Sequence, residues 1–138
     1  MPSDTSPAVC ILDDDPSVLR ATGRLAISAG WKAELFDDPE AFLSYARSNQ
    51  PRVAVVDVEM PRLNGLQVQE RLREVSPCTC VIFVSSVADP AVRERAIKAG
   101  AAAYYLKPMD GEDLLSAIAA VCGVRRGHPP ENTMAPRM

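Results

Sequence analysis

The chain has 138 residues, a length typical of one domain, and 47% hydrophobic and 24% charged residues place it among ordinary globular proteins. Its net charge of −3 and pI of about 5.1 give no basic surface that would predict direct binding of nucleic acid. No apolar run approaches the roughly 18 residues of a membrane span. Residues 1–7 hold no signal-peptide core, and the four cysteines are too few and too irregularly spaced for a disulfide framework. We therefore expect a cytoplasmic protein with reduced thiols and no membrane partner.

Short apolar runs alternate with helical patterns along residues 8–122. The runs at 9–12, 53–56 and 81–84 are continuous and rich in β-branched residues. Strands that are buried on both faces of a parallel sheet have this composition. Weaker runs lie at 33–36 and 104–106. The pattern predicts strands at 8–13, 33–36, 53–57, 80–85 and 103–107, and helices at 16–29, 39–48, 65–75, 90–99 and 111–122.

The starts of the predicted helices carry a repeated signal. Asp15, Asp38 and Asp89 each precede a proline. A carboxylate there can cap the first backbone N–H groups, and proline fits the first helical position, where its missing N–H costs nothing. Asn64 and Asp110 are candidate caps for the other two helices. These signals fix five helix starts independently of the apolar pattern.

Five strand–helix units in strict alternation predict an α/β fold, a doubly wound five-stranded parallel sheet of the type (βα)5. Gly30 and Gly100 are placed to end two helices in the left-handed conformation. Trp31 follows the first of them, so we expect it at the end of the sheet opposite the strands' carboxyl ends. Residues 8–122 form the predicted domain. Residues 1–7 are predicted to be a polar N-terminal tail, and 123–138 a flexible C-terminal tail or linker.

Polar residues directly follow four of the predicted strands. Asp13 and Asp14 end the first strand, Asp57 the third, Ser85 and Ser86 the fourth and Lys107 the fifth. Because the carboxyl ends of parallel strands meet at one edge, these side chains are expected to converge. Three carboxylates together repel one another, and a divalent cation relieves the repulsion; hard oxygen ligands with room for water favour Mg²⁺. A lysine and a hydroxyl beside that metal would complete a site for a phosphate-sized anion.

Other chemistries fit less well. No glycine-rich phosphate-binding motif follows a strand, and the single histidine, His128, lies in the predicted tail. An aspartyl-nucleophile phosphatase of the haloacid-dehalogenase class also uses Mg²⁺, a hydroxyl and a lysine. That class carries its nucleophile on the first strand in an Asp-x-Asp motif. Here Asp13 and Asp14 are adjacent and Asp57 lies on the third strand, so the order of the residues argues against a phosphatase.

Several stretches of the sequence match one known family. They are Ile-Leu-Asp-Asp-Asp-Pro at 11–16, Asp-Val-Glu-Met-Pro-Arg-Leu-Asn-Gly at 57–65, Val-Ile-Phe-Val-Ser-Ser at 81–86, Lys-Ala-Gly-Ala at 98–101, and Lys-Pro at 107–108. Over residues 8–122 the chain resembles the receiver domains of two-component response regulators, and within that family it is most similar to FixJ-type receivers. The resemblance implies the flavodoxin-like receiver fold.

The resemblance also implies roles for the acidic residues. Asp57 would be the phosphoacceptor. Asp14 and Asp57 would bind Mg²⁺ directly, Asp13 would bind it through water, and Glu59 would bind it through its backbone carbonyl. A phosphoryl group from a sensor histidine kinase or a phosphotransfer protein would then be transferred to Asp57.

The same resemblance assigns switch residues. Ser85 and Lys107 would contact the phosphoryl group, and Tyr104 would swing inward on activation. Lys107–Pro108 would be a cis peptide. Val87, two positions after the hydroxyl, has no group to orient a water, so self-dephosphorylation is expected to be slow.

The implied function is a phosphorylated switch of an interaction surface. Residues 90–99, 103–107 and 111–122 would form that surface, which could also join two copies as a homodimer. The domain would bind no nucleic acid directly and would not be a turnover enzyme. The alternative is that the chain is the N-terminal regulatory fragment of a DNA-binding transcription regulator.

Overall fold

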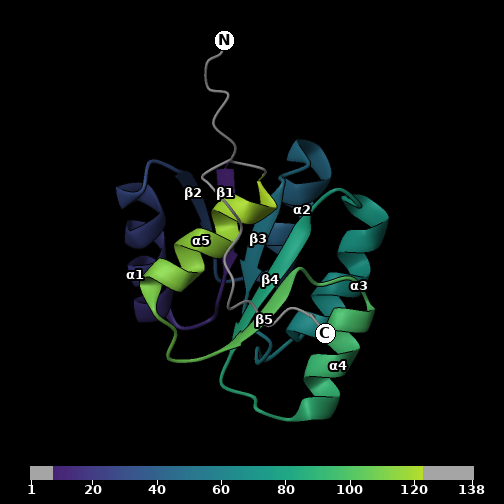
Figure 1. The fold of residues 1–138 in the computed structure, drawn as a ribbon. Helices are drawn as coiled ribbons and strands as arrows, with labels where there is room; N and C mark the ends of the chain where they lie inside the picture. The colour runs from purple at the N-terminus through teal and green to yellow at the C-terminus, as the bar shows by residue number, and fades with distance from the viewer. Residues whose placement is uncertain (1–7, 123–138) are drawn as a thin grey trace.

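Strands and helices alternate along the chain in the computed structural model, which describes residues 8–122 (Figure 1). The strands are β1 (Ala8–Leu12), β2 (Lys32–Phe36), β3 (Val53–Val56), β4 (Cys80–Ser85) and β5 (Ala103–Leu106). The helices are α1 (Pro16–Ser28), α2 (Pro39–Asn49), α3 (Gly65–Val75), α4 (Pro90–Lys98) and α5 (Gly111–Val121). All ten predicted elements are confirmed, and their bounds differ from the predicted ones by one residue at most.

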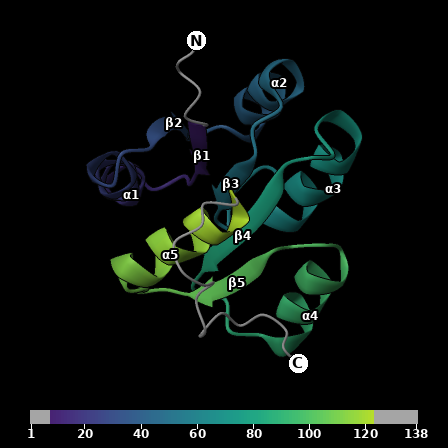
Figure 2. The ribbon, with the colours of Figure 1, turned by 45° about the horizontal axis from the view of Figure 1, so that its top comes forward.

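The five strands form one parallel sheet in the order β2-β1-β3-β4-β5. The chain first moves outward from β1 to β2 and then returns to the other side of β1 with β3. The strand order therefore reverses between β1 and β3, and the carboxyl ends of these two strands flank the crevice where doubly wound sheets bind ligands. Helices α1 and α5 cover one face of the sheet, and α2, α3 and α4 cover the other (Figures 1 and 2). The predicted doubly wound α/β fold is confirmed.

Strand β3 shows why the apolar runs carry no polar alternation. Val53 and Val55 pack in the core cluster on the side of α1 and α5, whereas Ala54 and Val56 pack in the cluster on the side of α2, α3 and α4. All four side chains are buried. A strand between two layers of helices needs apolar residues on both faces, which a continuous β-branched run supplies.

The predicted caps are all in place. Asp15 accepts hydrogen bonds from two backbone N–H groups of α1, and Asp38, Asp89 and Asp110 each accept one from their own helices. Asn64 forms a capping box in which its side chain and that of the third helical residue bond reciprocally to backbone N–H groups. The structure therefore satisfies the first backbone donors of all five helices locally.

Two glycines end helices in the left-handed region, Gly30 at φ +95° and Gly100 at φ +105°, as predicted. Across residues 8–122, no helix is long and apolar enough to cross a membrane. The predicted tails, 1–7 and 123–138, lie outside the described residues.

Candidate functional site

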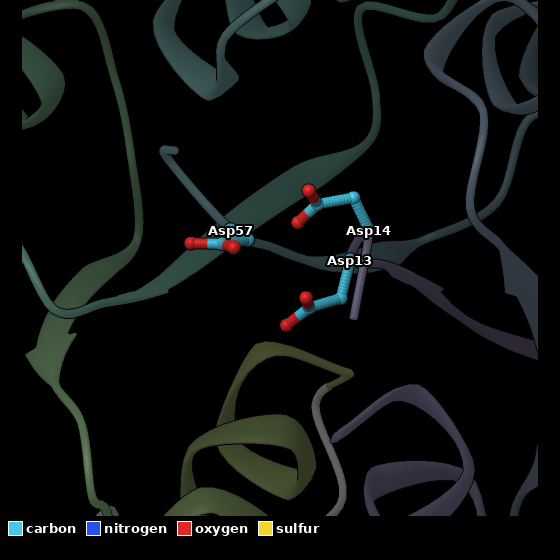
Figure 3. A group of neighbouring side chains, drawn as sticks. All are labelled: Asp13, Asp14 and Asp57. Atoms are coloured by element: carbon cyan, nitrogen blue, oxygen red, sulfur yellow. The ribbon is translucent and has the colours of Figure 1, made fainter. Parts of the chain in front are cut away.

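Three carboxylates meet where strands β1 and β3 end. Asp13 and Asp14 follow β1, Asp57 follows β3, and the two strands are neighbours in the sheet. One carboxylate oxygen from each residue lies within 4.8 Å of the others. Figure 3 shows the three side chains approaching one another from the two strand ends. The convergence of Asp13, Asp14 and Asp57 expected from strand order is therefore present.

The backbone continues the sheet ladder for one residue past the strand ends. The amide of Asp57 donates to the carbonyl of Leu12 at 3.0 Å, and the amide of Lys107 donates to the carbonyl of Ser85 at 2.9 Å. These bonds fix the polar residues relative to the buried strands. The peptide between Lys107 and Pro108 is cis, as the resemblance implied.

Lys107 reaches the carboxylates from β5. Its Nζ lies 3.1 Å from Oδ2 of Asp13 and 3.5 Å from Oδ2 of Asp57. Both aspartates are buried and the lysine is only partly exposed, so water screens these charges less than it would on the surface. The lysine therefore neutralises part of the acidic cluster.

The electrostatics of the site follow from burial and the neighbouring charges. Burial and the charge of Asp13 raise the pKa of Asp57 to about 6, against the opposing effect of Lys107 and of a backbone hydrogen bond. Burial alone would lower the pKa of Lys107, but the hydrogen bond and charge of Asp13 and the charge of Asp57 outweigh it, so the pKa is raised. The site thus combines a firmly protonated lysine with a carboxylate that is destabilised in its charged form.

The donor set suits a hard divalent cation. Asp13 Oδ1 accepts from the amide of Asp15 at 3.0 Å, and Asp57 Oδ1 accepts from the amide of Glu59 at 3.2 Å. Asp14 is exposed, and within residues 8–122 no group donates to its carboxylate. Oxygen ligands that are held in place, with one carboxylate left free, fit a cation that keeps several waters. The acidic pocket could therefore hold a metal ion.

An open cavity of about 730 Å³ surrounds the carboxylates. Its lining comes from the segments that follow β1, β3, β4 and β5: Asp13, Asp14, Asp15, Asp57, Val58, Glu59, Met60, Pro61, Asn64, Ser86 and Lys107. The cavity leaves room for water and for a group the size of a phosphate beside Asp57.

Ser85 and Tyr104 do not line this cavity. Both are buried; Ser85 Oγ accepts from the amide of Val87 at 2.9 Å, and the hydroxyl of Tyr104 donates to the carbonyl of Val87 at 2.8 Å. Burial raises the pKa of Tyr104 despite a hydrogen bond to Ser85. Tyr104 is thus in an inward position here. The phosphoryl contact of Ser85 and the switching of Tyr104 stay predictions.

Ser86 lines the cavity, although the sequence analysis assigned the phosphoryl contact to its neighbour Ser85 and gave Ser86 no role. Its Oγ donates to Oε1 of Glu59 at 3.0 Å, which joins the segments after β3 and β4 across the mouth of the cavity. Adjacent residues at a strand end point to opposite sides, so one of the two neighbouring serines had to face away from the other. The sequence carried that signal, although it did not say which serine faces the site.

Gly65 explains the glycine of the Asp57–Gly65 motif. Its amide donates to the carbonyl of Val58 at 2.9 Å and starts α3 directly against the backbone of Asp57 and Val58. A Cβ at this position would lie 2.6 Å from the carbonyl oxygen of Asp57 and 2.8 Å from the Cα of Val58. Only glycine allows the helix to begin this close to Asp57.

A second, mostly apolar cavity of about 540 Å³ lies between α1 and α5 and reaches the same carboxylates from the other side. Val18, Ala21 and Leu25 of α1 line it, together with Met109 and Leu114. Asp13, Asp57 and Lys107 also contribute to its lining, so this cavity adjoins the acidic site.

Comparisons with known proteins agree with this geometry. The family model of the response regulator receiver domain matches residues 9–119. The response regulator protein TodT of Pseudomonas putida is 36% identical over 136 residues, which are 99% of this chain and 59% of TodT. The photosynthetic apparatus regulatory protein RegA of Rhodovulum sulfidophilum is 33% identical over 94% of this chain and 70% of its own length. The chain thus spans about three fifths of the length of TodT.

Solved structures show the same fold. A response regulator receiver protein from Burkholderia phymatum is 38% identical, with a TM-score of 0.74 over 88% of this chain and 99% of that one. A CheY-like receiver domain protein from Methanospirillum hungatei gives a TM-score of 0.81 at 24% identity over 87% of this chain and 97% of that one. At that identity the second likeness supports the fold alone.

Proposed function

The chain belongs to the family of response regulator receiver domains of two-component signalling, and we propose that Asp57 is the residue on which it accepts the phosphoryl group. The observation that carries the proposal is the convergence of Asp57 with Asp13, Asp14 and Lys107 at the switch point of the sheet. Asp57 is the carboxylate that follows the central strand β3, and the open cavity adjoins it.

In the proposed reaction, an oxygen of the Asp57 carboxylate attacks the phosphorus of a phosphohistidine. The P–O bond to Asp57 forms, the P–N bond breaks, and the histidine leaves with the electron pair and takes up a proton. Asp57 must be ionised to attack, and its pKa of about 6 leaves it mostly ionised at neutral pH. Phosphoryl transfer of this kind depends on positioning and charge neutralisation more than on covalent help from the protein.

We propose Mg²⁺ as the cofactor, held by Asp13, Asp14, Asp57 and the backbone carbonyl of Glu59. When bound, it would supply positive charge against the transferring phosphoryl oxygens. Lys107 supplies the protein's own positive charge, since its Nζ already lies within 3.5 Å of an Asp57 oxygen. Ser85 is proposed to move toward the phosphoryl group and to hydrogen-bond it. Tyr104 is proposed to fill the space that Ser85 leaves.

Receiver domains of this family interact with histidine kinases, and we propose a sensor kinase or a phosphotransfer protein as the donor. The apolar cavity between α1 and α5 supports this, because it offers a contact surface beside the acceptor. Val18, Ala21 and Met109 would contact the partner. A transfer partner has to bind close to Asp57, and an apolar surface provides affinity without adding charge to the site.

The domain is proposed to be residues 8–122, to act in the cytoplasm, and to have no separate substrate that it turns over. Self-dephosphorylation is proposed to be slow because Val87 cannot orient a water and packs against the core. The α4–β5–α5 face, where Leu106 is 48% exposed, is the proposed interaction and homodimer surface.

A second proposed function is that of the regulatory part of a transcription regulator. This alternative is favoured because the chain matches only 59% of the length of TodT.

The proposal is tested by mass spectrometry of the protein after incubation with acetyl phosphate and Mg²⁺. We expect one phosphoryl adduct that is labile to hydroxylamine and absent both in Asp57→Asn and in wild type with EDTA. Asp37→Asn, an exposed aspartate outside the site, serves as the matched control and should be labelled normally. A hydroxylamine-stable adduct, or labelling that persists in Asp57→Asn, would contradict the assignment.

The proposed role of Lys107 is tested separately. The variant Lys107→Ala should still bind Mg²⁺, but phosphorylation should no longer change the α4–β5–α5 face.

A further inference from the structure

A cationic groove runs between α3 and α4, away from the acidic site. Leu66, Gln69, Glu70 and Arg73 of α3 line one wall, and Arg95, Lys98 and Ala99 line the other. The two helices lie side by side on the same face of the sheet (Figures 1 and 2). The groove is open to solvent and has a volume of about 320 Å³, which is at the lower end of the range for small-molecule sites.

The charge in this groove is opposite to that of the protein as a whole. The chain carries a net charge of −3, yet three cationic side chains and one carboxylate line the groove. The side chains of Arg73 and Arg95 make no hydrogen bond or ion pair with any residue of 8–122, and Lys98 Nζ lies 4.0 Å from Glu94 Oε2, at the limit of an ion pair. A cation in the last turn of a helix is stabilised by the helix dipole, which explains the basic residues of α3 and of α4 separately. The helix dipole does not explain why cations from the two helices line the same groove.

The floor of the groove holds a buried amide. Gln69 is 4% exposed, and its Nε2 donates to the carbonyl of Ala96 at 3.0 Å, which ties α3 to α4. Within the described chain its Oε1 accepts no hydrogen bond, and it is not a fully buried, unsatisfied atom, so it reaches water through the groove. The groove therefore combines an acceptor that is held in place by the bond to Ala96 with three exposed cationic donors along its walls.

We propose that this groove binds a small ligand that carries a di- or triphosphate group. Arginine guanidinium groups bind phosphate oxygens through paired hydrogen bonds, and two arginines from different helices can hold two phosphates. Gln69 Oε1 and the apolar side chain of Leu66 remain for the rest of the ligand. The small volume of the groove favours such a molecule over an extended segment of another protein. The source is a nucleotide or an inorganic polyphosphate, which share this chemistry.

Binding is tested by titration calorimetry and by amide chemical shifts, with ADP and with pyrophosphate as probes. EDTA is present, so that no metal can bring phosphate to the acidic site. Saturable binding of either probe is expected, with shifts centred on Leu66, Arg73, Arg95 and Lys98. Tighter binding of ADP would identify a nucleotide, whereas equal affinity would identify the polyphosphate group alone as the ligand. No saturation up to about 1 mM of either probe, a Kd that corresponds to about −4 kcal/mol, would overturn the proposal.

Variants separate a built site from general attraction between charges. Arg73→Gln combined with Arg95→Gln should weaken binding at least tenfold at about 0.15 M salt, where exposed charges are largely screened. The matched control is Arg20→Gln combined with Arg24→Gln, which removes two exposed cations from α1 and should change the affinity less than twofold. Equal weakening in both pairs would overturn the proposal. So would shifts centred on Asp57, or binding of a polyglutamate peptide but of neither phosphate probe.

Discussion

Strand β3 and helix α4 are held in the fold to very different degrees. All four residues of β3 are buried, and the strand pairs with neighbours on both sides. Helix α4 has nine residues, of which only Ala96 is buried, and the amide of Gln69 is the side chain that bonds to its backbone from α3. The proposed acceptor thus follows a fully buried strand, and the proposed interaction surface includes a helix with a single buried residue. Local stability of this kind determines which part of a protein can move at low free-energy cost.

The largest effect is expected where α3 starts against the backbone of Asp57 and Val58. Gly65→Ala should lower the free energy of unfolding by about 3 kcal/mol, because its Cβ would overlap the backbone of Asp57 and Val58. Urea denaturation measures the change. The control is Gly100→Ala beside α4, where a Cβ meets nothing within 4 Å and only the positive φ costs about 1 to 2 kcal/mol. If Gly100→Ala is the more destabilising variant, the segment after β3 is not packed more tightly than the end of α4.

A smaller effect is expected from the charge on Asp57. Without Mg²⁺, Asp57→Asn should stabilise the protein by about 2 kcal/mol at pH 8 and by much less at pH 4. The folded pKa of about 6 lies above the unfolded value near 4, so the folded state holds the proton more tightly. Wild-type stability therefore falls as pH rises from about 4 to 6, and the variant lacks this loss.

Thermal unfolding in EDTA across this pH range measures the difference between Asp57→Asn and wild type. Asp37→Asn should follow the wild-type curve, because Asp37 is exposed and lies outside the carboxylate cluster. A variant that is less stable than wild type at pH 8 would show that the ionised Asp57 is favoured by its surroundings rather than penalised.

Removing the bond between α3 and α4 should have a local effect. Gln69→Leu removes the hydrogen bond to the carbonyl of Ala96, and hydrogen exchange in α4 should accelerate about fivefold, which corresponds to about 1 kcal/mol. The exchange rates of the β3 amides should increase less, because they reflect only the loss of global stability. Glu74→Leu, on an exposed position of the same helix, is the control. Equal acceleration in β3 and α4 would mean that the two elements open together.

The smallest effect is expected at Trp31. It packs against the core just before β2 begins, at the end of the sheet opposite the acidic site. Mg²⁺ should therefore leave its fluorescence nearly unchanged, while a variant with Trp31→Phe and Ser86→Trp carries its tryptophan at the cavity and should respond. A large response of Trp31 itself would show that metal binding reaches the far end of the sheet.

Much of this molecule is determined locally, and the sequence alone predicts those parts. The helix starts at Asp15, Asp38 and Asp89 depend on bonds within a few residues, and the continuous apolar run of β3 is a direct consequence of burial on two faces. The meeting of Asp13 with Asp57 also follows from the sequence once the strands are known, because parallel strands place their carboxyl ends at one edge.

The tertiary structure determined the contacts between side chains that are distant from one another in the chain. The pairing of Lys107 with Asp13, the choice of Ser86 over Ser85 at the cavity, and the bond from Gln69 to α4 depend on how helices pack on the sheet. Several ways of packing the helices on the sheet are compatible with the same apolar pattern and the same helix caps. Each of these contacts depends on the positions of two separate elements, and no local signal in the sequence encodes both positions. Only tertiary packing therefore selects which side chains meet.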